Sequence, residues 1–184
     1  MTQPYQAGAA GDATVLTDGH RSTLVFVREL RHRPEKVWAA LTNPSNLREW
    51  APFDPDRNLG TTGQVTLTMA GPEPEKIECS VTRAEAPRFL EYTWGGDVLH
   101  WELEEIATGT RLTLRHTLED RSWAPRVAAG WHICLDVAER ALDGHPIGRI
   151  VADAAKRVGW ERLNAEYSQR FGIESPSSHA SREA

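Results

Sequence analysis

The most constraining feature of this sequence is a change in hydrophobic period partway along the chain. Five short runs alternate apolar and polar side chains, at 65–69, 77–81, 90–94, 99–103 and 112–118. A period of two residues is typical of a strand with one buried face. Turn-forming residues separate the runs, among them Gly71-Pro72 and Gly95-Gly96-Asp97. The pattern therefore predicts an antiparallel meander with one apolar face.

Residues 123–143 then change to helical spacing, with apolar side chains on a wide stripe. Ser122 is a suitable N-cap, and Gly144 suits the position that follows the last turn. This stretch is long enough to cover the apolar face of the predicted sheet. We therefore predict an α+β fold in which a curved antiparallel sheet grips a long C-terminal helix around an apolar pocket.

The segments before and after this core have weaker signals. A β-rich run at 22–30 predicts a first strand, and Pro34 and Asn43-Pro44 predict two short helices at 34–42 and 45–50. We expect a loop at 51–63 and an additional helical segment at 146–171, broken at Gly159. Residues 1–20 lack periodicity and predict a flexible N-terminal arm, whereas 173–184 predict a disordered tail. One domain is expected over 21–172.

Composition excludes several classes of function. The 184 residues carry a net charge of −5, which argues against a dedicated nucleic-acid-binding protein. No apolar leader and no run of about 18 apolar residues is present, so we expect a cytoplasmic protein without a membrane span. Cys79 and Cys134 lack metal-ligand spacing, and the nucleotide-binding and hydrolase motifs that we considered are absent. We therefore expect no cofactor, no metal and no catalytic motif.

Four segments in order carry a resemblance to a known family. They read RELRHRPEKVWAALTNPSNLREW (28–50), APRFLEYTWGG (86–96), GTRLTLRHTL (109–118) and GWHICLDVAERALDG (130–144). Together they resemble the homologues of the activator of heat-shock protein 90 ATPase, a family of the START-like, helix-grip (SRPBCC) superfamily. The resemblance implies the helix-grip fold and an internal cavity.

The pocket residues follow from alternation and from the helical stripe. We expect His116 on the inner face of its strand, where a buried polar group needs a partner, and Trp131 facing it from the helix. The set predicted to contact a ligand is His116, Tyr92, Trp94, Trp101, Trp131, Cys79 and Leu135. His132 and Asp136 are interpreted as a helix-surface pair. Arg28, Arg111 and Arg115 are interpreted as surface charges.

Three functions remain open at this point. The first is non-catalytic binding of a small apolar or aromatic molecule in the pocket. The second is an enzyme of the polyketide cyclase or aromatase kind, with His116 or a pocket tyrosine as general acid or base. The third is an interaction protein, for example a partner of a heat-shock protein 90 homologue. The two apolar stripes of 146–171 also suggest a homodimer contact.

Overall fold

A single antiparallel sheet forms the centre of the computed structural model, which describes residues 4–11 and 13–174. Its eight strands lie in the order β1-β2-β8-β7-β6-β5-β4-β3, so every neighbouring pair except β2 and β8 is consecutive in sequence. The strands are β1 (Ala13–Asp18), β2 (Arg21–Leu30), β3 (Phe53–Pro55), β4 (Gly63–Met69), β5 (Lys76–Glu85), β6 (Phe89–Trp94), β7 (Asp97–Ile106) and β8 (Gly109–Leu118). The predicted meander is therefore present.

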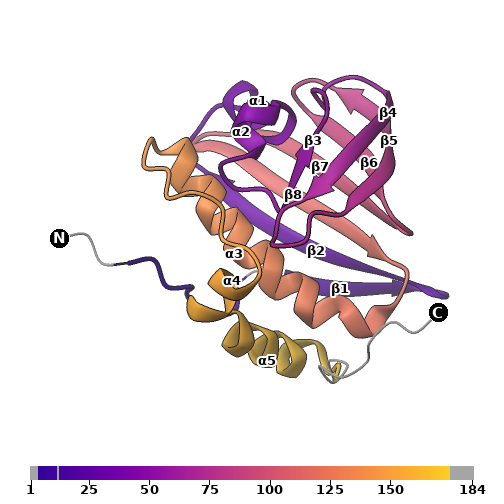
Figure 1. Ribbon diagram of the computed structural model, residues 1–184, viewed down its shortest axis with the longest axis vertical. Helices are drawn as coiled ribbons and strands as arrows, with labels where there is room; N and C mark the ends of the chain where they lie inside the picture. The colour runs from indigo at the N-terminus through magenta and orange to yellow at the C-terminus, as the bar shows by residue number, and fades with distance from the viewer. Residues whose placement is uncertain (1–3, 12, 175–184) are drawn as a thin grey trace.

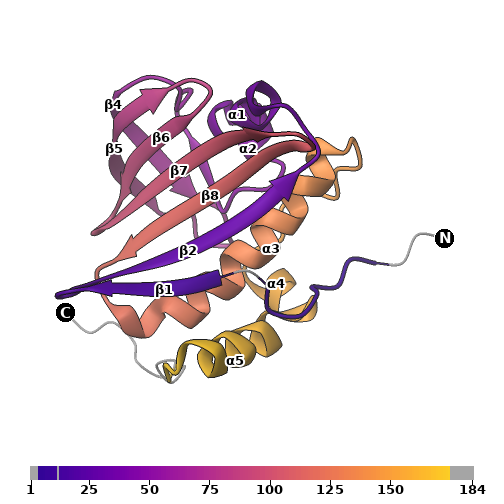
Figure 2. The same ribbon diagram turned by 180° about the vertical axis from the view of Figure 1, so that it is seen from behind.

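One long helix covers a face of this sheet. The helices are α1 (Pro34–Thr42), α2 (Pro44–Leu47), α3 (Ala124–Leu142), α4 (Asp153–Arg157) and α5 (Trp160–Phe171), with a 3-10 turn, η1, at Arg121–Trp123. The helix α3 crosses the sheet diagonally, α5 lies on α3, and α1 and α2 lie beside the upper end of α3 (Figure 1). The reverse view shows β1, β2, β8 and β7 on the other side of α3 (Figure 2). The predicted α+β helix-grip fold is confirmed.

Every second side chain along the strands points toward α3, and these side chains form the core between the sheet and the helix. On β8, Leu112, Leu114, His116 and Leu118 are all buried. His116 pairs in register with Leu24 of β2 and Leu99 of β7, which are both fully buried. Burying each such leucine contributes about 1.5–3 kcal/mol, so this inner face supplies much of the stability. Among the described residues, no helix is both long and apolar enough to span a membrane.

The beginning of the chain differs from the expected flexible arm at 1–20. Residues 13–18 form β1, which pairs with β2 from Ala13 opposite Phe26 to Asp18 opposite Arg21. The preceding residues are held by α5, because Ala10 N donates to Glu166 Oε2 (2.7 Å) and Gly11 N donates to the Tyr167 hydroxyl (3.1 Å). The sheet therefore begins at Ala13 rather than near residue 21.

Two other predicted segments are also corrected. The predicted loop at 51–63 contains the short strand β3, which pairs with β4 through Phe53 and Met69. In the predicted helical segment at 146–171, residues 146–152 are not helical. The expected break at Gly159 is present, where φ is +110° between α4 and α5. Of the predicted disordered tail, residues 175–184 lie outside the described part of the chain.

Gly109 fixes the start of β8 against the end of β2. Its φ is +144°, a conformation that L side chains rarely adopt. A Cβ atom at this position would overlap the carbonyl oxygen of Leu30 and would lie 2.8 Å from the amide nitrogen of His32. The close approach of two backbones therefore requires glycine here.

Candidate functional site: a cavity between the sheet and α3

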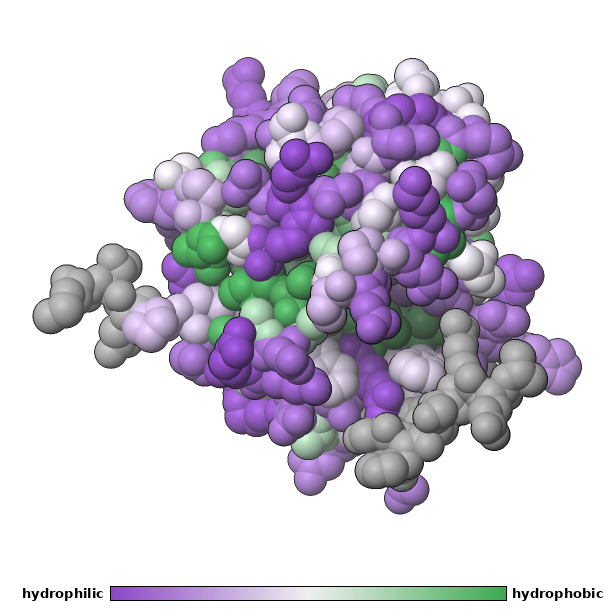
Figure 3. Space-filling model, in the orientation of Figure 1, coloured by the Kyte–Doolittle hydropathy of each residue, from purple (hydrophilic) through white to green (hydrophobic). Residues whose placement is uncertain are grey.

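A cavity of about 390 Å³ lies between the N-terminal half of α3 and the end of the sheet that carries the β6–β7 turn. Trp94, His116 and Trp131 form an aromatic wall. The other lining residues are Pro52, Glu75, Ile77, Gly95, Gly96, Asp97, Glu119, Val127, Gly130 and Cys134. Apolar atoms gather across the middle of one face of the molecule, between hydrophilic side chains above and below (Figure 3).

A second hollow of about 570 Å³ adjoins this cavity. The two share Trp94, Asp97, Glu119 and Val127, so they form one continuous recess. The outer hollow is lined in addition by Trp123, whose side chain is substantially exposed. Trp123 therefore extends the aromatic surface of the recess toward solvent.

His116 is the polar centre of the aromatic wall, and both of its ring nitrogens have partners. Trp131 Nε1 donates to His116 Nδ1 at 2.9 Å. Because an indole nitrogen only donates, Nδ1 accepts and the ring proton lies on Nε2. Nε2 in turn donates to Asp97 Oδ2 at 2.9 Å. The predicted partner of this buried histidine is thus a pair of residues, Asp97 and Trp131.

This arrangement gives His116 a positioning role. The ring also stacks on Trp94, with centroids 5.8 Å apart and planes 21° apart. Trp131 packs edge-on against Trp94 at 5.7 Å and against Trp101 at 5.4 Å. A general base needs a free nitrogen within reach of its substrate, and neither nitrogen of His116 is free. His116 therefore orients the indoles of the wall.

The seven residues predicted to contact a ligand separate into two groups. His116, Trp94 and Trp131 line the cavity, whereas Tyr92, Trp101, Cys79 and Leu135 do not. Tyr92 and Trp101 are buried beneath it, where Trp101 Nε1 donates to the Tyr92 hydroxyl (3.2 Å) and burial raises the pKa of Tyr92. Leu135 lines only a small void on the α1 side of α3.

The two cysteines also differ in position from expectation. Cys79 is buried on β5 outside the cavity lining, and its Sγ lies 3.6 Å from the carbonyl oxygen of Ile77. Cys134 of α3, which was not among the residues predicted to contact a ligand, lines the cavity. Burial raises the pKa of the Cys134 thiol to about 12, so it is protonated and unreactive at neutral pH.

Gly130 is a lining residue that sequence reasoning did not identify. A Cβ atom built on Gly130 would have no neighbour within 4 Å, so this position on α3 opens onto free space. Glycine within a helix costs about 1 kcal/mol relative to alanine. A glycine at this position, inside an otherwise strongly helical sequence, was therefore the signal that could have identified Gly130 as a lining residue. The missing side chain keeps the middle of α3 thin where it borders the cavity.

Asp97 was also missed, because the Gly95-Gly96-Asp97 segment was interpreted only as a turn. Glu119 was missed because it follows the alternating run at 112–118. Burial opposes ionisation of Asp97. The hydrogen bonds from His116 and from Glu119 N (2.8 Å) outweigh that effect and lower the pKa of Asp97. Its carboxylate is therefore charged at neutral pH. The side chain of Glu119 covers Gly96, where a Cβ atom would overlap its carboxylate.

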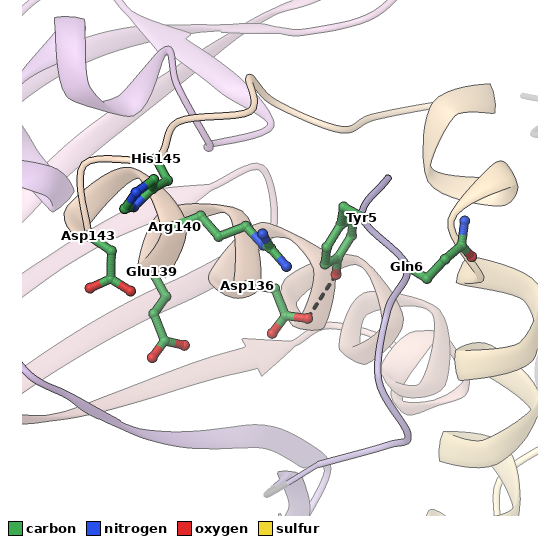
Figure 4. Close-up of a pocket in the computed structure, with 7 residues that line it drawn as sticks. All are labelled: Tyr5, Gln6, Asp136, Glu139, Arg140, Asp143 and His145. Atoms are coloured by element: carbon green, nitrogen blue, oxygen red, sulfur yellow. Dashed lines mark hydrogen bonds between the residues drawn. The ribbon is translucent and has the colours of Figure 1, made fainter. Parts of the chain in front are cut away.

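A different, polar cavity of about 390 Å³ lies on the outer side of α3. Its lining residues are Tyr5, Gln6, Asp136, Glu139, Arg140, Asp143 and His145, and the Tyr5 hydroxyl donates to Asp136 Oδ2 at 2.8 Å (Figure 4). Asp136 also pairs with Arg28 Nη1 at 3.0 Å. The N-terminal residues thus cross α3 and attach to its outer face through Asp136.

Two interpretations made from sequence are corrected here. His132 is 3% exposed and its Nδ1 lies 2.9 Å from the Tyr167 hydroxyl, so His132 and Asp136 are not a surface pair. The reason is that α5 and the N-terminal residues cover this side of α3. Arg28 turns toward α3 rather than to solvent, because it shares the inner face of β2 with Leu24 and Phe26.

Acid is expected to weaken the contact at Asp136. Burial opposes ionisation, but the hydrogen bonds from His132 and Tyr5 and the charge of Arg28 lower the pKa of Asp136. A carboxyl group whose pKa is lower in the folded state stabilises the fold above its unfolded pKa of about 3.9. That stabilisation is lost as the pH falls through the folded pKa.

Asp136→Asn should therefore lower the free energy of unfolding at pH 7 by about 1–2 kcal/mol. It should also flatten the loss of stability below about pH 4. Urea unfolding between pH 7 and pH 2.5 measures both effects. Asp153→Asn is the matched control, because the side chain of Asp153 is 84% exposed and pairs with Lys156 on the surface. An unchanged acid dependence in Asp136→Asn would contradict the assignment.

The chain is similar to known proteins in sequence pattern and in fold. Residues 31–143 match the family described as Activator of Hsp90 ATPase homolog 1-like protein. No curated protein matches the chain by sequence. The predicted resemblance at the family level is confirmed.

Three solved structures illustrate the likeness in fold. A conserved protein of unknown function from Enterococcus faecalis aligns with a TM-score of 0.67 and 18% identity over 86% of this chain and 90% of its own. CalU16 from Micromonospora echinospora gives 0.60 and 21% over 85% and 94%. The AHSA1-like protein from Aeromonas hydrophila gives 0.58 and 20% over 66% and 92%. At these identities the likeness is one of fold.

Proposed function

Because the chain belongs to the family of Activator of Hsp90 ATPase homolog 1-like proteins, within the START-like superfamily, we propose that it binds a small apolar or aromatic molecule without catalysis. The family has a general ligand-binding fold. In this chain the binding site would be the cavity between α3 and the sheet. Its ligand would lie against Trp94 and Trp131.

One observation carries the proposal: the aromatic wall borders open space instead of being filled by its neighbours. A volume of about 390 Å³ lies within the range of about 300–1,000 Å³ of small-molecule sites. Tyr92 and Trp101 fill the core beneath the wall, so the cavity is additional to a complete core. The large indole surfaces suit a flat apolar ligand.

The same geometry favours binding over the cyclase-type alternative. His116, the polar group at the centre of the wall, already accepts from Trp131 and donates to Asp97. Tyr92, the tyrosine considered as an acid or base, lies outside the cavity lining, and its hydroxyl accepts from Trp101. The groups proposed for proton transfer are thus engaged in holding the wall together.

The segment at 146–171, considered for a homodimer contact, packs largely within the chain. Leu163 and Tyr167 of α5 are fully buried, and Tyr167 packs edge-on against Phe26 of β2 at 5.9 Å. The second of the two apolar stripes, on α5, therefore has an intramolecular partner. The ligand-binding proposal is made for one chain.

Titration with naphthylethanol, a neutral aromatic probe, tests the proposal. Saturable 1:1 binding is expected, with a rise in melting temperature equivalent to about 2.7 kcal/mol at a probe concentration of 100 times Kd. The indole N–H resonances of Trp94 and Trp131 should shift in nuclear magnetic resonance spectra. Those of Trp38 on α1 and Trp160 on α5 serve as internal controls, because both lie outside the lining.

The proposal fails if no probe concentration shifts the melting temperature. It also fails if the resonances of Trp38 and Trp160 shift while those of Trp94 and Trp131 stay unchanged, because the probe would then bind elsewhere.

A further inference from the structure

The charged groups that line the ligand cavity all have one sign. Glu75, Asp97 and Glu119 line the inner cavity, and Asp120 joins Asp97 and Glu119 in the outer hollow. Neither lining contains a lysine or an arginine. The recess is therefore lined by four carboxylates alongside its indole side chains.

The charge of Asp97 is not neutralised by its partner. His116 accepts at Nδ1 from Trp131, so its ring carries one proton and no net charge. Asp97 consequently keeps its negative charge at the edge of the aromatic wall. Among the described residues, the carboxylates of Glu75 and Glu119 have no ion-pair partner.

The aromatic residues of the recess favour the same sign of ligand charge. The face of an indole ring carries negative potential and attracts cations. At the mouth of the recess the protein itself shows this contact, because the Arg126 guanidinium lies over the ring of Trp123 at 5.1 Å. Trp94 and Trp131 add indole surface to a lining that also contains the carboxylates of Glu75, Asp97 and Glu119.

Two arginines lie near the recess: Arg126, whose guanidinium lies over Trp123, and Arg149 on the other side of the cavity. Neither is among the lining residues. Arg149 is close enough to lower the pKa of Cys134, but burial of that thiol is the larger effect. Its guanidinium is held by Asp54 through bonds of 2.6 and 3.1 Å. Arg149 therefore has its counter-charge outside the cavity.

From this combination of an open aromatic cavity and an all-acidic lining, we infer that the ligand carries a positive charge. The class would be an aromatic or apolar body bearing a protonated amine or a quaternary ammonium group. Carboxylate-bearing molecules such as fatty acids would be disfavoured. This inference rests on the proposed function, because it names the ligand class of the same cavity.

Three probes that share one aromatic body and differ in charge test the inference. Naphthylethylamine is cationic at pH 7, naphthylethanol is neutral and naphthylacetate is anionic. Calorimetric titration should give the tightest binding for the amine, with a Kd about tenfold below that of the acid. Raising the salt concentration from about 0.05 to 0.5 M should narrow this ratio, because the carboxylates are at the exposed rim.

The double variant Glu75→Gln/Glu119→Gln removes two of the charges while keeping side-chain size. The ratio of the Kd values for acid and amine should fall from about tenfold to about threefold or less. Glu105→Gln, at the far end of β7 from the cavity, is the matched control and should keep the wild-type ratio.

The outcomes separate this inference from the proposed function. Equal affinity for the three probes, or tightest binding of the acid, overturns the charge preference and leaves the cavity as a binding site. A ratio that is unchanged in the double variant also overturns it, because the preference would then come from elsewhere. If the wild-type protein binds none of the three, the proposed function fails and the inference fails with it.

Discussion

Replacing Gly130 by leucine is expected to weaken ligand binding at least about tenfold without unfolding the protein. A side chain at this position meets no atom near its Cβ and extends into the cavity beside Trp131. The substitution also replaces glycine inside α3 by a good helix former, which should raise the free energy of unfolding by up to about 1 kcal/mol. Calorimetric titration and urea unfolding measure the two effects.

Gly130→Ala separates the two causes. Alanine gives the same gain in helix propensity but adds only a methyl group, so binding should stay within about threefold of the wild type. If Gly130→Leu binds the neutral probe as tightly as the wild-type protein, the ligand does not occupy the cavity beside α3. A leucine variant with lower stability than the wild type would show that the space is not open.

Replacing Gly109 by alanine is expected to destabilise the fold by about 3 kcal/mol or more. The backbone conformation at φ of +144° costs about 1–3 kcal/mol for a residue with a side chain. In addition, the new methyl group would collide with the backbone at Leu30, Arg31 and His32, which cannot move without breaking the end of β2. Urea unfolding of the variant measures the loss.

Gly19→Ala is a control for a positive φ without a close backbone contact. Gly19 lies in the β1–β2 turn with φ of +57°, and a Cβ atom there has no neighbour within 4 Å. Its replacement should cost about 1 kcal/mol, the typical penalty of the left-handed conformation. Equal losses for both variants would mean that the contact between Gly109 and the end of β2 adds nothing to stability.

Six strands and α3 could be predicted: β2 from its β-rich composition, and the five strands of the meander and α3 because burial of one face forces a visible pattern. On β8, every second side chain from Leu112 to Leu118 is buried, and the stripe of α3 faces the same core. A strand of this kind cannot shift its pairing register by one residue without exposing its apolar side chains to solvent. The short strands lack this constraint.

The strand β1 shows why the first residues were not recognised as part of the fold. It lies at the edge of the sheet, and Leu16 is 59% exposed, so alternation there is weak. What holds β1 is its backbone ladder with β2 and the bond from Arg170 Nε of α5 to Ala13 O (3.2 Å). Neither interaction leaves a periodic signal in the sequence.

The site could be predicted only in part, because alternation gives the face of a residue but not its depth. Tyr92 and Trp94 are two residues apart on the inner face of β6, yet only Trp94 reaches the cavity. The diagonal placement of α3 decides which end of each strand is covered. His116 was recognisable as a buried polar group, but Asp97 was not. Asp97 lies two residues before Leu99, the residue of β7 that pairs in register with His116, so its bond to His116 runs diagonally between two strands.

The attachment of the N-terminal residues to α5 also has a consequence for the order of folding. Ala7 N donates to Val158 O at 2.9 Å, and Arg162 Nη2 donates to Ala7 O at 2.6 Å, so these bonds join residues about 150 positions apart. Closing so long a loop is entropically unfavourable until the intervening sheet has formed. During synthesis on a ribosome, Ala7 is made long before Val158 and Arg162, so it stays unattached until these two residues have also emerged. A segment that precedes the sheet in sequence therefore depends on a helix that follows it for its native contacts.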